Sequence, residues 1–150
     1  MAEKMTAERA FELTSGQGFH CSQVVVMHGC EVLGMDKDLL LKVSGGFGGG
    51  CFHGDICGAV TGALMMLGAV YGYNQPGQKE QNAILVGKIR EFEKRFEEKY
   101  GALTCTALLG GYNITIPEQA KIIMEQGLNK NCPAMIAGAC DILDDMLAEK

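Results

Sequence analysis

The chain has 150 residues, of which 47% are hydrophobic, so it has the length of one domain and enough apolar material for a core. Its formal net charge of −5 argues against nucleic-acid binding, which requires clustered Lys and Arg side chains. We therefore expect a single domain over residues 1–150 without a nucleic-acid partner.

The first ten residues carry charged side chains where a signal peptide would have its apolar core. This pattern favours a cytoplasmic protein. The uncharged run over residues 56–78 is long enough to be considered as a membrane span, but it contains several glycines together with Thr61 and Asn74. We interpret it as a buried central helix and expect no membrane span.

The first part of the chain predicts two helices with clear end signals. Thr6 is suited to cap a short helix that runs to about residue 13. A second helix is expected over residues 21–33, because Gly34 is suited to the left-handed conformation that ends many helices.

A short apolar helix over residues 39–43, capped by Asp36, is expected to lead into a glycine-rich segment at residues 45–50. Asp55 is then placed to cap the central helix. Cys57 follows two residues later and would lie in the first turn of that helix.

Gly58 and Gly62 lie four residues apart and therefore on one face of the central helix. Glycine inside a helix costs about 1 kcal/mol relative to alanine. Close packing of a neighbouring backbone against these two positions would offset that cost, so we expect a helix to cross here.

A long amphipathic helix is predicted over residues 79–100, with Gly101 as its end. Thr104 is suited to cap the next short helix, which places Cys105 at a helix start.

Thr115 and Glu118 have the spacing of a capping box and open a helix that ends near Gly127. The last helix is expected to begin around Cys132 and Pro133. Because strand-like segments are absent from the pattern, the predicted fold is all-α, a compact bundle of six to eight helices around the glycine-rich central helix.

The seven cysteines are more consistent with thiols, cluster ligands or redox partners than with structural disulfides in a reducing compartment. No Cys-x-x-Cys motif occurs, which excludes the thioredoxin signature, zinc ribbons and the usual haem-attachment motif. The tight cysteine spacings of ferredoxins are also missing. A shared site must therefore collect single cysteines from distant segments.

Four cysteines share one predicted setting, the first turn of a separate helix. They are Cys21, Cys57, Cys105 and Cys132. A helix N-terminus favours negative charge, so it should lower the pKa of a thiol placed there. Because the thiolate is both the nucleophile and the metal ligand, these four residues suit either thiol chemistry or the binding of iron, zinc or an iron–sulfur cluster.

The remaining cysteines and the nearby histidines have less specific settings. Cys30 and Cys140 lie deeper in their helices, where small cysteines commonly pack in the core. Cys51 could be a resolving thiol or an additional ligand together with His53, although loop burial fits Cys51 equally well. His20 and His53 are each close in sequence to a cysteine, so either could be a proton donor or thiolate partner, or could have only a surface or capping role.

The chain resembles the C_GCAxxG_C_C family of redox-active proteins over nearly its whole length. Cys57-Gly58-Ala59 with Gly62 is similar to the central motif of the family, and the outlying family cysteines correspond to Cys21, Cys105 and Cys132. Cys51 departs from the family pattern, in which this position is often another residue. A related domain occurs in split-Soret cytochrome c, for which an iron–sulfur cluster has been proposed, but this chain lacks a haem-attachment motif.

The leading hypothesis is a small redox protein in which Cys21, Cys57, Cys105 and Cys132 ligate an iron–sulfur cluster of the [2Fe–2S] type for electron transfer to a partner protein. One alternative is metal-free thiol–disulfide chemistry, with Cys57 as the attacking thiolate and Cys51 or Cys21 as the resolving thiol. Another is a structural zinc site or an interaction domain. Whether a substrate is turned over is left open.

The helices that hold Gly58 and Gly62 and residues 79–100 could also support a homodimer, although core packing explains both helices equally well.

Overall fold

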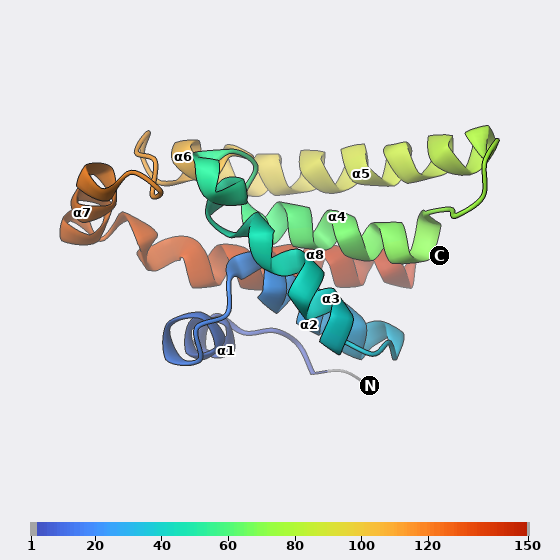
Figure 1. The fold of residues 1–150 in the computed structure, drawn as a ribbon, viewed down its shortest axis with the longest axis horizontal. Helices are drawn as coiled ribbons and strands as arrows, with labels where there is room; N and C mark the ends of the chain where they lie inside the picture. The colour runs from blue at the N-terminus through green and yellow to red at the C-terminus, as the bar shows by residue number, and fades with distance from the viewer. Residues whose placement is uncertain (1–2, 150) are drawn as a thin grey trace.

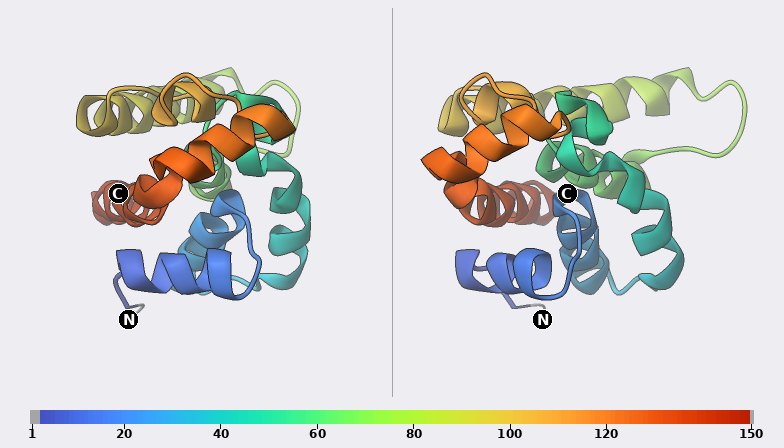
Figure 2. Two further views of the ribbon diagram at one scale, coloured as in Figure 1. Left: turned by 90° about the vertical axis from the view of Figure 1, so that its left-hand side faces the viewer. Right: turned by 60° about the vertical axis from the view of Figure 1, so that its left-hand side comes forward.

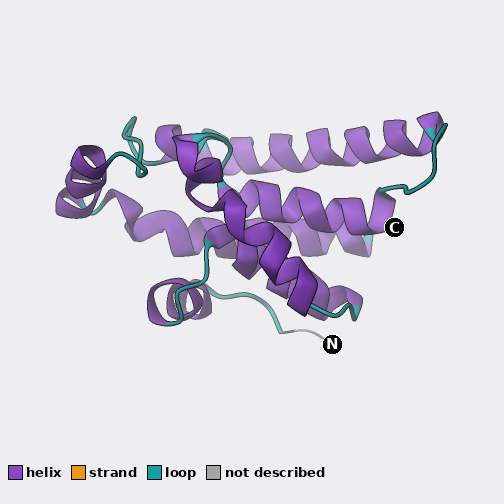
Figure 3. Cartoon of the chain, viewed as in Figure 1, coloured by secondary structure: helices purple, strands orange, loops and turns teal. Residues whose placement is uncertain are grey.

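The computed structural model describes residues 3–149, and within that range the chain forms eight α-helices and no β-strand (Figures 1 and 3). The all-α prediction is therefore confirmed. The helices are α1 Ala7–Phe11, α2 Cys21–Leu33, α3 Asp38–Ser44, α4 Gly58–Tyr71, α5 Lys79–Tyr100, α6 Cys105–Leu108, α7 Pro117–Gln126 and α8 Cys132–Ala148.

Helix α4 occupies the centre of the molecule and packs against α2, α5 and α8. Figure 1 shows α4 and α5 as an antiparallel pair, with α8 running beside α4, and Figure 2 shows α1 on the side away from α5. The buried side chains of α4 include Met66 and Leu67, which join Phe92 and Phe96 of α5 in the core. We call the contact of α2, α4 and α8 the packed middle.

The predicted close approach at Gly58 and Gly62 is confirmed by the packing of α2 on α4. A Cβ atom at Gly62 would lie 2.6 Å from the backbone oxygen of Ser22, and one at Gly58 would collide with the sulfur of Cys21. The missing side chains therefore allow the backbone of α2 to lie directly on α4, which offsets the poor helix propensity of glycine.

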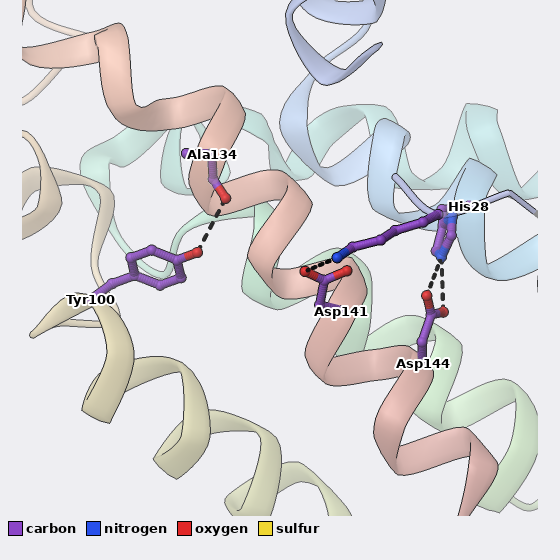
Figure 4. A network of polar contacts seen from close by, with 6 residues as sticks. His28, Tyr100, Ala134, Asp141 and Asp144 are labelled. Carbon is purple, nitrogen blue, oxygen red and sulfur yellow. Dashed lines mark hydrogen bonds and ion pairs between the residues drawn. The ribbon is translucent and has the colours of Figure 1, made fainter. Parts of the chain in front are cut away.

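A buried histidine joins α2 to α8 in the packed middle (Figure 4). The His28 side chain is 1% exposed, and its Nε2 lies 2.8 Å and 3.0 Å from the two carboxylate oxygens of Asp144. Nearby on α8, Asp141 forms an ion pair with Lys4, and the carbonyl oxygen of Ala134 accepts a hydrogen bond from the hydroxyl of Tyr100. One nitrogen of the buried ring thus has a partner that offsets its loss of water, whereas the other, Nδ1, is buried without a hydrogen-bond partner among the described residues.

Most of the predicted helix ends are confirmed. The Thr6 hydroxyl oxygen accepts a hydrogen bond from the backbone of Arg9, and that of Thr104 accepts one from the backbone of Ala107. Glycine in the left-handed conformation ends three helices as expected, at Gly34, Gly101 and Gly127.

Three predicted caps are wrong. Asp36 lies one residue before the cap residue of α3, which is Lys37, although its side chain accepts a hydrogen bond from the backbone of Asp38 at 3.0 Å. Asp55 does not cap α4, whose cap residue is Cys57, because the backbone of Asp55 is used in contacts with Gly50 and Cys105. Thr115 and Glu118 do not form a capping box. The Thr115 hydroxyl instead donates to Asn113 Oδ1 at 2.6 Å, and Ile116 is the residue before α7.

None of the helices within residues 3–149 combines the length and the apolar character needed to cross a membrane. Of the uncharged run that raised this question, only residues 58–71 form a helix, α4, which is 14 residues long and packs against its neighbours.

Candidate functional site

The four cysteines singled out in the sequence all lie at helix starts. Cys21, Cys105 and Cys132 are the first residues of α2, α6 and α8, and Cys57 immediately precedes α4 as its cap residue. The starts of these four helices lie toward the same end of the molecule, on the left in Figure 1. We call the region around these four residues the cysteine end.

Two of these cysteines are in direct contact. The Cys57 thiol donates a hydrogen bond to the sulfur of Cys21, which is half-buried. Gly58 makes this contact possible, because a side chain at that position would occupy the place of the Cys21 sulfur. The glycine that follows Cys57 in the sequence motif therefore has a specific structural role.

The sulfur of Cys21 also accepts hydrogen bonds from backbone N–H groups, including those of Gly49 and Ser22. Together with the larger effect of the Cys57 thiol, these donors lower the pKa of Cys21 to about 6, against the opposing effect of burial. Backbone N–H groups that converge in this way stabilise an anion. Cys21 is therefore suited to exist as a thiolate at neutral pH.

The other three thiols behave differently, and the expectation of a lowered pKa at each helix start is wrong for them. The hydrogen bond donated to Cys21, followed by burial, raises the pKa of Cys57. Burial raises the pKa of Cys105 to about 12 and that of Cys132 to about 11. Burial outweighs the helix dipole here, and α6, with only four residues, has a small dipole.

The four thiols are close enough to influence one another electrostatically. Charge on Cys21 raises the pKa of each of the other three, Cys105 does so for Cys57, and Cys132 does so for Cys105. Within residues 3–149, however, no three side chains of Cys, His, Asp or Glu are spaced to bind a single metal ion. The structure thus gathers the four sulfurs into one region without arranging them as a mononuclear metal site.

A short backbone bridge brings Cys57 and Cys105 together. Ile56 and Thr104 form an isolated antiparallel bridge, flanked by hydrogen bonds from Cys57 N to Leu103 O at 2.8 Å and from Cys105 N to Asp55 O at 2.7 Å. The starts of α4 and α6 are fixed side by side as a result. Because this pairing joins distant segments, no local sequence signal indicated it.

The glycine-rich segment forms a left-handed turn beside Cys21. Gly49, Gly50, Cys51 and Phe52 have φ angles of 58°, 64°, 59° and 56°. For the two non-glycine residues this conformation costs roughly 1–2 kcal/mol each. The turn directs the N–H of Gly49 to the sulfur of Cys21, so the strain is located at the cysteine end.

The structure holds this turn through contacts on both sides. Asn113 Nδ2 donates to the carbonyl oxygen of His53 at 2.9 Å, and the His20 ring lies edge-on to the Phe52 ring with 5.2 Å between centroids. Cys51 is half-buried and His53 is exposed. Neither belongs to a group spaced to bind a metal ion within the described part of the chain.

The two cysteines expected in the core are there. Cys30 is 1% exposed and Cys140 is fully buried, and burial raises the pKa of both thiols. His20 precedes α2, and its backbone N–H donates to the side chain of Gln23 at 2.9 Å, a helix-capping contact.

The fold and the site together define an all-helical protein with thiols gathered at one end. A family model described as "Putative redox-active protein (C_GCAxxG_C_C)" matches residues 19–146, and the chain therefore belongs to this family of cysteine-containing redox-active proteins. Comparisons with curated proteins and with solved structures gave no match.

Proposed function

We propose that this chain is an electron-transfer protein in which Cys21, Cys57, Cys105 and Cys132 ligate an iron–sulfur cluster of the [2Fe–2S] type. The proposal is supported above all by the mutual charge interaction of four thiols that come from four separate helix starts. Four cysteine thiolates are the ligand set of such clusters. A site made of Cys21 and Cys57 alone would not require Cys105 and Cys132 to lie at the cysteine end as well.

The chemistry of the four thiols fits an iron–sulfur cluster. The hydrogen bond to Cys21, followed by burial, keeps Cys57 protonated, and burial and mutual repulsion keep Cys105 and Cys132 protonated. Holding all four as thiolates therefore requires positive charge among them. A bound cluster would supply that charge and one-electron redox chemistry. The backbone N–H groups that donate to Cys21 already act in the same direction, because hydrogen bonds to sulfur stabilise the thiolate.

Metal analysis of anaerobically purified protein tests the proposal. We expect stoichiometric iron and acid-labile sulfide together with visible absorption. Replacing Cys57 with alanine should abolish the absorption, whereas Cys140→Ala, which alters a buried thiol in the middle of α8, should preserve it. Protein without iron, or equal spectra for the two variants, would contradict cluster binding. Zinc in place of iron would instead favour a structural metal site.

A second function, thiol–disulfide exchange, is supported by the hydrogen bond between Cys57 and Cys21. In this reaction the Cys21 thiolate attacks a disulfide of the substrate and releases one thiol. Cys57 then attacks Cys21, so a Cys21–Cys57 disulfide forms as the substrate disulfide is reduced to two thiols. The lowered pKa of Cys21 makes it the attacking residue, which reverses the roles expected from the sequence.

Mass spectrometry after mild oxidation separates the two functions. Metal-free thiol exchange predicts a loss of two alkylatable thiols, at Cys21 and Cys57, that dithiothreitol restores. Cluster binding predicts that iron protects four cysteines in the isolated protein and that removing iron exposes them. A protein that shows neither pattern would have neither function.

A further inference from the structure

The glycine-rich segment between α3 and α4 is held to the rest of the fold at both of its ends. At its entry, the hydroxyl of the buried Ser22 donates a hydrogen bond to the carbonyl oxygen of Ser44 at 2.7 Å. At its exit, Nδ2 of Asn113 donates to the carbonyl oxygen of His53 at 2.9 Å. The left-handed turn over residues 49–52 lies between these two contacts, so its conformation is fixed from two separate parts of the fold.

Asn113 is itself fixed by a network of hydrogen bonds. Its Oδ1 accepts from the backbone N–H of Thr115 at 2.9 Å and from the hydroxyl of Thr115 at 2.6 Å. Its backbone N–H donates to the side-chain oxygen of Gln119 at 2.6 Å. Because a backbone N–H can only donate, the atom of Asn113 that faces it is the oxygen, and the amide nitrogen is the atom that faces His53.

The segment around Asn113 also packs directly on the backbone next to the turn. Gly54 has a φ angle of 73°, and a Cβ atom there would lie 2.8 Å from Cγ of Asn113. A Cβ atom at Gly49 would lie 3.6 Å from the methyl group of Thr115, which is ordinary van der Waals contact. Asn113 and Thr115 therefore support the glycine-rich segment at both the first and the last residues of its left-handed part.

The turn needs this support because its own backbone opposes it. Cys51 and Phe52 have φ angles of 59° and 56°, a conformation that residues with a Cβ atom rarely adopt. Strained conformations of this kind persist only where surrounding contacts over-determine them. If the contact of Asn113 is lost, the turn can relax toward right-handed backbone, which moves the N–H of Gly49 away from the sulfur of Cys21.

We propose that Asn113 is a positioning residue that, by holding the left-handed turn, keeps the N–H of Gly49 on the sulfur of Cys21 and raises the reduction potential of the bound cluster. The effect on the potential rests on the cluster binding proposed above. One-electron reduction adds negative charge to the cluster and its sulfur ligands without making or breaking a bond. A hydrogen-bond donor to one of these sulfurs stabilises the more negative, reduced state.

Hydrogen exchange of the Gly49 amide, followed by NMR in the reduced, metal-free full chain, tests the position of the N–H group. Asn113→Leu should speed this exchange by about fivefold, the effect of losing one hydrogen bond from the contacts that hold the turn. Thr115→Val keeps the methyl group but removes the hydroxyl that donates to Asn113, so it should speed the exchange by less. Unchanged exchange at Gly49 in both variants would overturn the proposal.

Two controls separate positioning from a general loss of stability. Asn82→Leu removes a side chain near the start of α5 that accepts a hydrogen bond from the Tyr73 hydroxyl, and it should leave the exchange at Gly49 unchanged. The amide of the buried Phe92 reports global unfolding, and Asn113→Leu should leave its exchange unchanged as well. Equal acceleration at Gly49 and Phe92 would assign Asn113 a merely structural role and overturn the proposal.

Redox titration of the iron-loaded full chain against a reference dye, with dithionite as the reductant, tests the effect on the cluster. At equal iron content, Asn113→Leu should shift the reduction equilibrium about fivefold toward the oxidised form, whereas Asn82→Leu should not shift it. An unchanged equilibrium, or a shift toward the reduced form, would overturn the proposal. Absence of iron would contradict cluster binding itself, and the exchange at Gly49 would still decide whether Asn113 positions the N–H group, so the two failures are distinguishable.

Discussion

Glycine has different structural roles in the packed middle and at the cysteine end. In the packed middle, Gly62 lies in a regular right-handed helix, where its missing side chain lets α2 approach α4. At the cysteine end, Gly49 and Gly50 supply left-handed backbone that directs an N–H group to Cys21. In the packed middle, glycine stabilises the fold through close packing. At the cysteine end, it helps to lower the pKa of a thiol, and the neighbouring non-glycine residues carry backbone strain.

Because the roles differ, substitutions in the two regions should affect different measurable properties. Substitutions in the packed middle should alter the free energy of unfolding. Substitutions at the cysteine end should alter thiol reactivity, and removing strain there should even increase the free energy of unfolding. The following four predictions test that separation, beginning with the largest expected effect.

The first prediction compares one cysteine from each region. At pH 7, iodoacetamide should alkylate Cys21 about a hundredfold faster than Cys140 in the reduced, metal-free protein. The reason is that the pKa of Cys21 is lowered to about 6, whereas burial raises the pKa of Cys140. The rate at Cys21 should rise as pH increases through about 6 and then level off, since the thiolate forms above its pKa. Peptide mapping after timed alkylation measures both rates, and a Cys21 rate that rises only above pH 8 would contradict the assignment.

The second prediction concerns the crossing of α2 and α4. Gly62→Ala should lower the free energy of unfolding by about 2 kcal/mol, because the added methyl group meets backbone atoms of Ser22 that cannot move aside independently. Gly68→Ala on the same helix meets no atom within 4 Å and should raise it by up to about 1 kcal/mol through helix propensity. Urea denaturation measures both values. Equal effects of the two substitutions would show that backbone contact does not determine the glycine at position 62.

The third prediction concerns the buried histidine. Asp144→Ala should lower the free energy of unfolding by about 1.5 kcal/mol, because it leaves Nε2 of the buried His28 without its partner. Asp145→Ala removes an exposed neighbouring carboxylate and should change stability by less than about 0.5 kcal/mol. Thermal or urea unfolding compares the two variants. A similar loss for both would assign the effect to net charge rather than to the His28 contact.

The fourth prediction concerns strain in the left-handed turn. Cys51→Gly should raise the free energy of unfolding by about 1 kcal/mol, because glycine adopts this conformation without the cost of a Cβ atom. Cys51→Ala removes the thiol but keeps the Cβ atom, so it should give no such gain. If glycine instead destabilised the protein, the contacts of the Cys51 side chain would outweigh the strain.

The sequence predicted the features that depend on neighbouring residues. Thr104 and Gly101 are local signals, so the end of α5 and the start of α6 were predicted correctly, and with them the position of Cys105. The cap assigned to Asp55 was wrong because its backbone pairs with a segment some fifty residues away, and long-range pairing overrides a local preference.

The contact between the cysteines and the direction of their pKa shifts depend on how the helices pack, so local sequence signals could not predict them. The order of the residues indicates that Cys21 and Cys57 lie at helix starts, but their contact follows from how α2 crosses α4 at Gly58. The direction of each pKa shift depends on donors that only the packed fold supplies. The Cys57 thiol and backbone N–H groups lower the pKa of Cys21, whereas burial raises that of Cys132, although both residues begin long helices.

The bridge between Ile56 and Thr104 has a consequence for the order in which the site is assembled. It closes a loop of roughly fifty residues, whose entropic cost is met only when α4 and α5 dock as a hairpin. On the ribosome, Cys21 and Cys57 are synthesised well before Cys105 and Cys132. The nascent chain is therefore expected to hold the contact between Cys21 and Cys57 first, and to gather all four thiols only after the start of α8 has been synthesised.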